Sequence, residues 1–115
     1  MRVNSREKGK RGERYFKQRL IGVFPNIRRN ANEQSQMGGV DLLECEPFDF
    51  EVKIGEICKS RKIRLWIDQV EAEGNPANFK TVLVKPDDEK PYAIIPLDDF
   101  LNILELMKNE GIIKS

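Results

Sequence analysis

Residues 48–54 read Phe-Asp-Phe-Glu-Val-Lys-Ile, and this stretch decides the fold. Because successive side chains of a strand point to opposite faces, the strict alternation of apolar and charged residues predicts a half-buried β-strand. Its charged face would carry Glu51 and Lys53, about 6.5–7 Å apart along the strand. Such a pair is either an ordinary ion pair on an exposed sheet surface or part of a functional site, and the flanking sequence favours the site.

The segment before this stretch supplies a second carboxylate. Residues 40–45 are predicted to form a strand, and Glu46-Pro47 a tight turn, so that Asp41 folds back beside Glu51 and Val52. Two carboxylates from neighbouring strands, together with the backbone carbonyl of Val52, form an oxygen cage suited to Mg²⁺ or Mn²⁺. We therefore expect a divalent cation at this point, with Asp41, Glu51 and Val52 as ligands.

Two predicted helices add polar groups to the same region. The first covers residues 5–24, and Glu13 shares its apolar stripe with Phe16, Leu20, Val23 and Phe24. An acid on that face either looks into a metal site, as a further ligand or a partner of a metal-bound water, or reaches solvent at the edge of the stripe. The second helix covers residues 62–73, with a strand over 63–67 as the alternative. Its Gln69 could orient the site without competing for the metal.

The remaining pattern completes a single domain over residues 1–115. Short strands are expected near residues 28–31, 80–85 and 92–95, and a last helix runs from Pro96 to Gly111. The order is αβββαββα, which predicts an α/β fold with a mixed central sheet flanked by helices.

Composition limits the chemistry that the chain can perform. Hydrophobic residues make up 39% and charged residues 34%, and there is no histidine. The reaction would therefore have to use carboxylates, lysine, amides and a metal. The two cysteines, Cys45 and Cys58, are too few for a disulfide framework or a zinc set, and we expect reduced thiols in an intracellular, cytoplasmic protein. No apolar run is long enough for a membrane span or a signal peptide.

Charge is unevenly distributed along the chain. Residues 1–30 carry ten Lys and Arg against two acids, whereas the other 85 residues carry ten against seventeen. Such asymmetry favours a surface for a polyanion such as DNA, and the alternative is a basic helix that faces only solvent. The expected DNA-binding residues are Lys8, Lys10, Arg11, Arg14, Lys17, Arg28 and Arg29.

These residues carry a family resemblance. Gly39-Val40-Asp41 followed by Glu51-Val52-Lys53 resembles the signature of the PD-(D/E)XK nuclease superfamily, with Val40 where that pattern has proline. Within the superfamily, residues 10–14, 35–41 and 65–69 are similar to segments of the small archaeal-type and phage-type Holliday junction resolvases. The similarity extends over residues 7–100 and implies a restriction-endonuclease-like fold.

The resemblance also implies an activity. It implies Mg²⁺-dependent endonucleolysis, in which Asp41, Glu51 and Lys53 form the catalytic core and Glu13 is the acid from the first helix. Branched DNA is the expected substrate, and the gene could belong to a phage or prophage. The alternatives are a nickase or exonuclease of the same superfamily, or a non-catalytic DNA-binding module. A degenerate binder would be expected to have lost one of the three core residues, and all are present.

Resolvases are commonly homodimers, and the two-fold symmetry of a four-way junction suits a C2 dimer with two active sites. We therefore expect a homodimer. Apolar residues for its interface are available on the 62–73 helix, as Trp66 and Ile67, and on the last helix, as Ile103, Leu106 and Met107. Trp66 could equally be buried inside one subunit.

Overall fold

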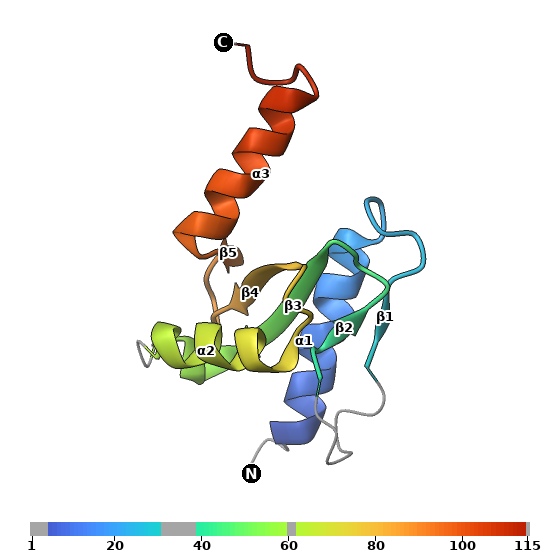
Figure 1. Ribbon diagram of the computed structural model, residues 1–115. Coiled ribbons are helices and arrows are strands. Elements are labelled where there is room, and N and C mark those ends of the chain that lie inside the picture. Colours follow the sequence, from blue (N-terminus) through green and yellow to red (C-terminus); the bar gives the residue numbers. More distant parts are fainter. Residues whose placement is uncertain (1–4, 31–38, 60–61, 115) are drawn as a thin grey trace.

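The computed structural model describes residues 5–30, 39–59 and 62–114. It has a mixed α/β architecture, as the sequence predicts (Figure 1). The helices and strands, in chain order, are α1 (Ser5–Leu20), β1 (Arg28–Arg29), β2 (Leu42–Leu43), β3 (Phe48–Ile54), the 3₁₀ turn η1 (Gly55–Lys59), α2 (Ile63–Glu73), β4 (Phe79–Lys85), β5 (Tyr92–Ile94) and α3 (Leu97–Asn109).

Two small sheets organise the domain. Strands β3 and β4 are parallel and are joined through α2, and β5 pairs antiparallel with the other edge of β4. Strands β1 and β2 form a separate antiparallel pair. The two sheets are linked where the Asp41 N–H donates to the carbonyl of Phe50 at 3.2 Å.

Apolar residues form a cluster on each face of the larger sheet. One cluster joins α1 to the sheet and contains Phe16, Phe50 and Leu83. The other joins α2 to the sheet and contains Trp66, Val70 and Val82. The alternation in residues 48–54 therefore has the predicted effect, because Phe50 packs toward α1 while the charged residues of β3 lie on the side of α2.

Two of the predicted elements need correction. The first helix ends at Leu20 instead of Phe24, and Val23 is 71% exposed instead of lying in the buried stripe. The strand predicted at residues 40–45 is only Leu42–Leu43, and it pairs with β1 instead of β3. The side chain of Asp41 explains why β2 does not pair with β3, because its Oδ2 accepts the Val52 N–H, a donor that a β2–β3 ladder would have needed.

The helix predicted at residues 62–73 is confirmed as α2, and the strand alternative is excluded. Trp66 on this helix is 4% exposed and packs in the core, so it cannot form a dimer interface as the sequence allowed. Both cysteines are unpaired, and Cys45 is buried. Among the described residues, no helix is long and apolar enough to cross a membrane.

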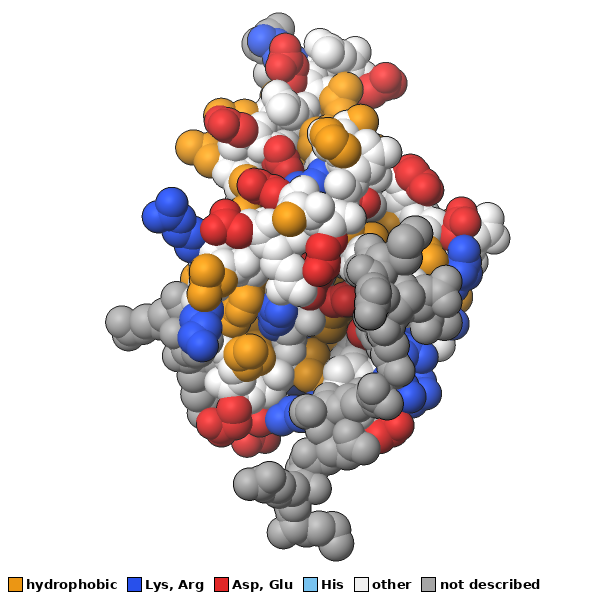
Figure 2. All heavy atoms as spheres, turned by 60° about the horizontal axis from the view of Figure 1, so that its bottom comes forward, with side chains coloured by type: hydrophobic (Ala, Val, Ile, Leu, Met, Phe, Trp, Pro, Cys, Tyr) orange, Lys and Arg blue, Asp and Glu red, His pale blue; other side chains and the backbone are white. Residues whose placement is uncertain are grey.

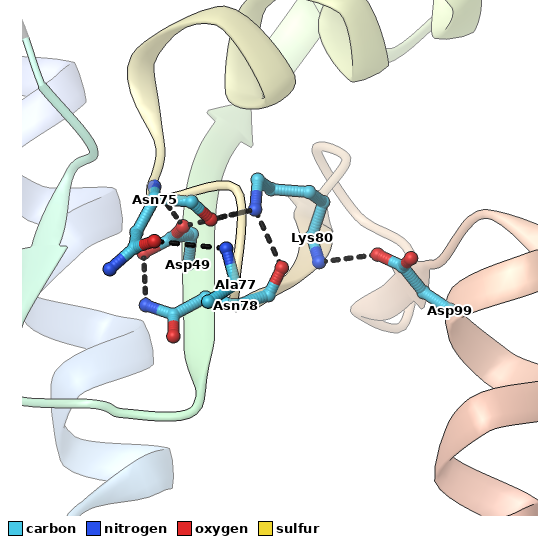
Figure 3. Close-up of polar contacts among 6 residues, drawn as sticks. All are labelled: Asp49, Asn75, Ala77, Asn78, Lys80 and Asp99. Atoms are coloured by element: carbon cyan, nitrogen blue, oxygen red, sulfur yellow. Dashed lines mark hydrogen bonds and ion pairs between the residues drawn. The ribbon is translucent and has the colours of Figure 1, made fainter.

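A buried polar cluster fixes the turn between α2 and β4 (Figure 3). The Lys80 ammonium lies 3.3 Å from Oδ2 of Asp49 and donates to the carbonyls of Asn75 and Asn78 at 2.5 and 2.6 Å. The Asp49 carboxylate accepts from the Asn75 N–H at 2.7 Å and from the Asn78 amide at 3.1 Å. The Lys80 N–H in turn donates to Asp99 at 2.7 Å, which ties the first turn of α3 to β4.

Candidate active site

Two of the predicted metal ligands lie together at β3. Asp41 precedes β2, and its Oδ2 accepts the Val52 N–H at 2.7 Å, which holds the carboxylate against the strand that carries Glu51. Glu51 is 3% exposed on the face of β3 that α2 covers. The short approach between the two segments thus arises from a side-chain hydrogen bond instead of the predicted strand ladder.

A glycine shapes the backbone just before Asp41. Gly39 has φ +113°, in the left-handed region that residues with a Cβ rarely adopt. The Asn30 amide donates to the next carbonyl, that of Val40, at 2.8 Å. These features direct the chain into Asp41, while residues 35–38 of the predicted glycine loop lie outside the described part of the structure.

Glu51 is electrostatically unfavourable as a free carboxylate. Burial and, next, the negative charge of Asp41 raise its pKa from 4.5 to about 9, against the lowering effect of the Lys53 ammonium. Its Oε2 is buried and has no hydrogen-bond partner among the described residues. A buried, unpartnered carboxylate oxygen beside a second carboxylate is a site that a hard cation would stabilise.

Lys53 is held in place beside Glu51. Its ammonium lies 3.5 Å from Oε1 of Glu51 and donates to Oε1 of Gln69 on α2 at 3.0 Å. The structure thus brings Gln69 to Lys53, as a neutral acceptor that fixes the ammonium without adding charge. The lysine side chain is 16% exposed, so it is partly shielded from water yet accessible to a ligand.

Glu73 belongs to this cluster although it was not among the predicted residues. Its Oε1 accepts from the Gln69 amide at 3.5 Å, and its charge contributes to the raised pKa of Glu51. The contact would orient the Gln69 amide with its oxygen toward Lys53. The signal was available in the sequence, because residues four apart on a helix lie on one face.

Glu13 is buried as predicted, at 5% exposure, but it is paired differently. Its Oε1 accepts from Nε of Arg29 on β1 at 3.0 Å. Within residues 5–30, 39–59 and 62–114, no three metal-ligating side chains converge. The structure therefore joins Asp41 and Glu51, while Glu13 forms a neighbouring ion pair with an arginine that we had expected to contact DNA.

The predicted DNA-binding residues divide into two groups. Four of them are ion-paired with acids: Lys8 with Asp87, Lys10 with Glu7, Arg28 with Glu44, and Arg29 with Glu13. In the described part of the chain, the charged groups of Arg11, Arg14 and Lys17 on α1 form no ion pair, and both arginines are exposed. These three residues are the ones most available to a polyanion.

A hollow of about 340 Å³ opens between the start of α1 and the end of β3. It offers a ligand access to the strand that carries Glu51. Its lining residues are Lys8, Gly9, Val52, Lys53, Ile54, Glu56 and Ile57.

Comparison with known proteins does not extend these findings. No family model matches the chain, and no curated protein or solved structure is significantly similar to it. The chemistry of the site therefore has to be inferred from its own residues.

Proposed function

We propose that the protein is a Mg²⁺- or Mn²⁺-dependent DNA endonuclease with a restriction-endonuclease-like arrangement of its sheet, acting on branched DNA. The observation that carries the proposal is the cluster of Asp41, Glu51 and Lys53. The Asp41 carboxylate is close enough to raise the pKa of Glu51, one oxygen of Glu51 is buried without a hydrogen-bond partner in the described part of the chain, and a lysine is fixed beside it. The basic residues of α1 support DNA as the ligand.

The donor set fits the proposed cation. Asp41 and Glu51 would hold it, with the Val52 carbonyl as a further oxygen ligand, and all of these are hard oxygen donors of the kind Mg²⁺ prefers. When bound, the cation would polarise the scissile phosphate and lower the pKa of a water molecule. Its positive charge would also remove the cost of keeping two carboxylates side by side.

Lys53 would act on the phosphate directly. Its ammonium donates a hydrogen bond to Oε1 of Gln69 and lies near Glu51, so the group is oriented before substrate arrives. A further N–H can then donate to a non-bridging phosphate oxygen and stabilise the charge that develops during attack. Gln69 positions Lys53 and does not itself need to touch the substrate.

A second candidate function is a DNA-binding module without catalysis. The observation that favours it is the Glu13–Arg29 ion pair, which uses an acid that the resemblance assigns to the catalytic site. In this case the α1 residues would bind DNA and the Asp41–Glu51 pair would hold a structural cation.

Cleavage of labelled DNA separates the two candidates. We expect a four-way junction to be cut in Mg²⁺ and left intact in EDTA, with flap and linear duplex DNA as comparison substrates. Lys53→Met is expected to slow cleavage by about 10²-fold or more, because it removes a donor aimed at the developing charge. Asp68→Asn, an exposed acid on α2, is the matched control and should cleave normally. Binding of the junction without metal-dependent cutting of any substrate would favour the module.

Neutralising the unpaired basic residues of α1 should weaken DNA binding. Each of Arg11→Gln, Arg14→Gln and Lys17→Gln is expected to lower affinity and to reduce the slope of log K against log salt by up to about 0.9, since each phosphate contact releases one counterion. Fluorescence anisotropy at several salt concentrations measures this slope. Arg64→Gln, an exposed arginine on α2, is the control. Equal slopes in all four variants would mean that α1 faces only solvent.

A further inference from the structure

The hollow at the end of β3 lies directly beside the candidate active site. It has a volume of about 340 Å³, and Lys53 forms part of its lining. Pockets for small ligands have volumes of about 300–1,000 Å³, so this hollow suits a group the size of one nucleotide and is too small for a duplex. An occupant would be held next to the lysine that we assign to the phosphate.

Apolar side chains form much of the wall of the hollow. Val52 and Ile54 are half-buried, and Ile57 is 45% exposed. The faces of a nucleobase are apolar and pack well against such side chains, whereas a phosphate gains nothing from them. In a continuous duplex these faces are covered by the neighbouring bases. The walls therefore favour a base that has left the stack.

A lysine from α1 supplies positive charge to the hollow. Lys8 lies against Gly55, where a Cβ would collide with its Nζ, so the glycine leaves room for the ammonium at the end of β3. The ion pair of Lys8 with Asp87 is 3.4 Å long and partly exposed, so a phosphate can replace this acid at little cost. Glu56 also lines the hollow, but it is exposed and the two lysines outnumber it. Figure 2, in which the lower part of the Figure 1 view comes forward, shows hydrophobic and Lys or Arg side chains next to one another on this side.

Gly9 keeps the space beside α1 open. It lies within the helix, where glycine is the least favourable residue after proline. Packing inside the protein explains Gly12, because a Cβ there would collide with the side chain of Ile54. Packing does not explain Gly9, since an added Cβ would have no atom of another described element within 4 Å. Because Gly9 lines the hollow, a side chain at this position would take up space that an occupant needs.

We propose that this hollow binds one unpaired nucleotide of the DNA, whose base packs against the apolar wall while Lys8 binds its phosphate. This binding mode rests on the proposed endonuclease function and narrows its substrate to DNA in which a base next to the cut can leave the stack. A branch point meets this condition, because bases there have lost a stacking or pairing neighbour and are extruded at lower cost. The hollow would thus select the branch through a single nucleotide instead of through base sequence.

Binding to two labelled duplexes tests this assignment. One duplex is fully paired, and the other carries one extra, unpaired nucleotide in one strand. In EDTA, fluorescence anisotropy should show about tenfold tighter binding of the second duplex, since one packed base contributes an effect of about this size. Gly9→Leu fills the hollow from a position where leucine favours the helix, so it should lower the affinity for the second duplex to that for the first. Gly22→Leu is the matched control, because its side chain also enters open space but lies outside the hollow.

A change in the wall provides a second test. Ile57→Asp should also abolish the preference for the unpaired nucleotide, because it removes apolar surface and repels the phosphate. Leu106→Asp is the control, since Leu106 is an equally accessible leucine, 51% exposed, on the distant helix α3 (Figure 1). Circular dichroism checks that each variant remains folded.

A fluorescent base reports extrusion directly. The adenine analogue 2-aminopurine fluoresces more strongly outside the base stack, so at the branch of a four-way junction it should brighten when the protein binds in EDTA. With Gly9→Leu the signal should stay low, even at protein concentrations that saturate the junction.

Several results would overturn the inference. They are equal affinity for the two duplexes, a preference that Gly9→Leu retains or Gly22→Leu also removes, and an unchanged 2-aminopurine signal on binding. None of these measurements requires cleavage. A protein that shows the preference but cuts no DNA in Mg²⁺ would refute the endonuclease and leave the hollow as a nucleotide site. Metal-dependent cutting without the preference would refute only the inference about the hollow.

Discussion

Glu51→Gln is expected to make the metal-free protein more stable at pH 7 by roughly 3 kcal/mol, while it abolishes metal-dependent cleavage. In the folded protein the pKa of Glu51 is raised from 4.5 to about 9, first by burial and then by the charge of Asp41. At pH 7 the unfolded chain loses this proton and the folded chain retains it. Each unit by which pH 7 exceeds the unfolded pKa of 4.5 lowers the free energy of unfolding by about 1.4 kcal/mol. Glutamine has a similar shape and no such cost.

Because the pKa of Glu51 is higher in the folded than in the unfolded protein, the stability of the parent protein should depend on pH. A carboxyl with a raised pKa stabilises the folded state fully below its unfolded value of 4.5, and this contribution is lost as the pH rises toward about 9. The free energy of unfolding of the parent protein should therefore fall between pH 5 and pH 8 relative to that of Glu51→Gln. Urea unfolding in EDTA at a series of pH values measures the difference.

The exposed Glu56→Gln variant is the control, and its stability should follow that of the parent protein at each pH. Mg²⁺ should stabilise the parent and leave Glu51→Gln nearly unchanged, because a ligand that binds only the folded state raises its stability. A Glu51→Gln protein that is less stable than the parent at pH 7 would contradict this prediction. It would show that the Glu51 carboxyl makes a stabilising hydrogen bond in the folded protein.

Local patterns in the sequence were sufficient for three of the regular elements, β3, α2 and α3. The alternation in residues 48–54 predicted β3, and apolar residues at helical spacing predicted α2 and α3. The partner of β2 could not be predicted in this way. Its pairing with β1 depends on a side chain, since Asp41 accepts the Val52 N–H that a ladder to β3 would have used. Hydrophobic periodicity contains no information about such a substitution.

In the candidate site too, some contacts could be predicted from the sequence and others could not. The order of Asp41, Glu51 and Lys53 placed the three residues near one another, and the position of Gln69 on α2 brought it to Lys53. The pairing of Glu13 with Arg29 was missed, because it depends on where β1 crosses α1, a contact between residues 16 apart. An acid in an apolar stripe requires a partner, but the stripe does not identify which one.

The buried ion pair between Asp49 and Lys80 was also beyond prediction, because it depends on the parallel register that places these two residues side by side. Asp49→Ala is expected to cost about 3–5 kcal/mol of stability, since it leaves the Lys80 ammonium buried without its counter-charge. It also removes the acceptor of the Asn75 N–H and the Asn78 amide. Chemical denaturation measures the loss, with the exposed Asp68→Ala on α2 as the control.

A second variant distinguishes the lost charge from lost packing. Adding Lys80→Met to Asp49→Ala removes the unpaired charge and keeps an aliphatic side chain at position 80, so the double variant should be more stable than Asp49→Ala alone. The Lys80 N–H would still reach Asp99, because that bond uses the backbone, and the base of α3 would stay in place. Equal instability of the single and double variants would show that the turn between α2 and β4 is held by the Asp49 hydrogen bonds, and that the ion pair contributes little.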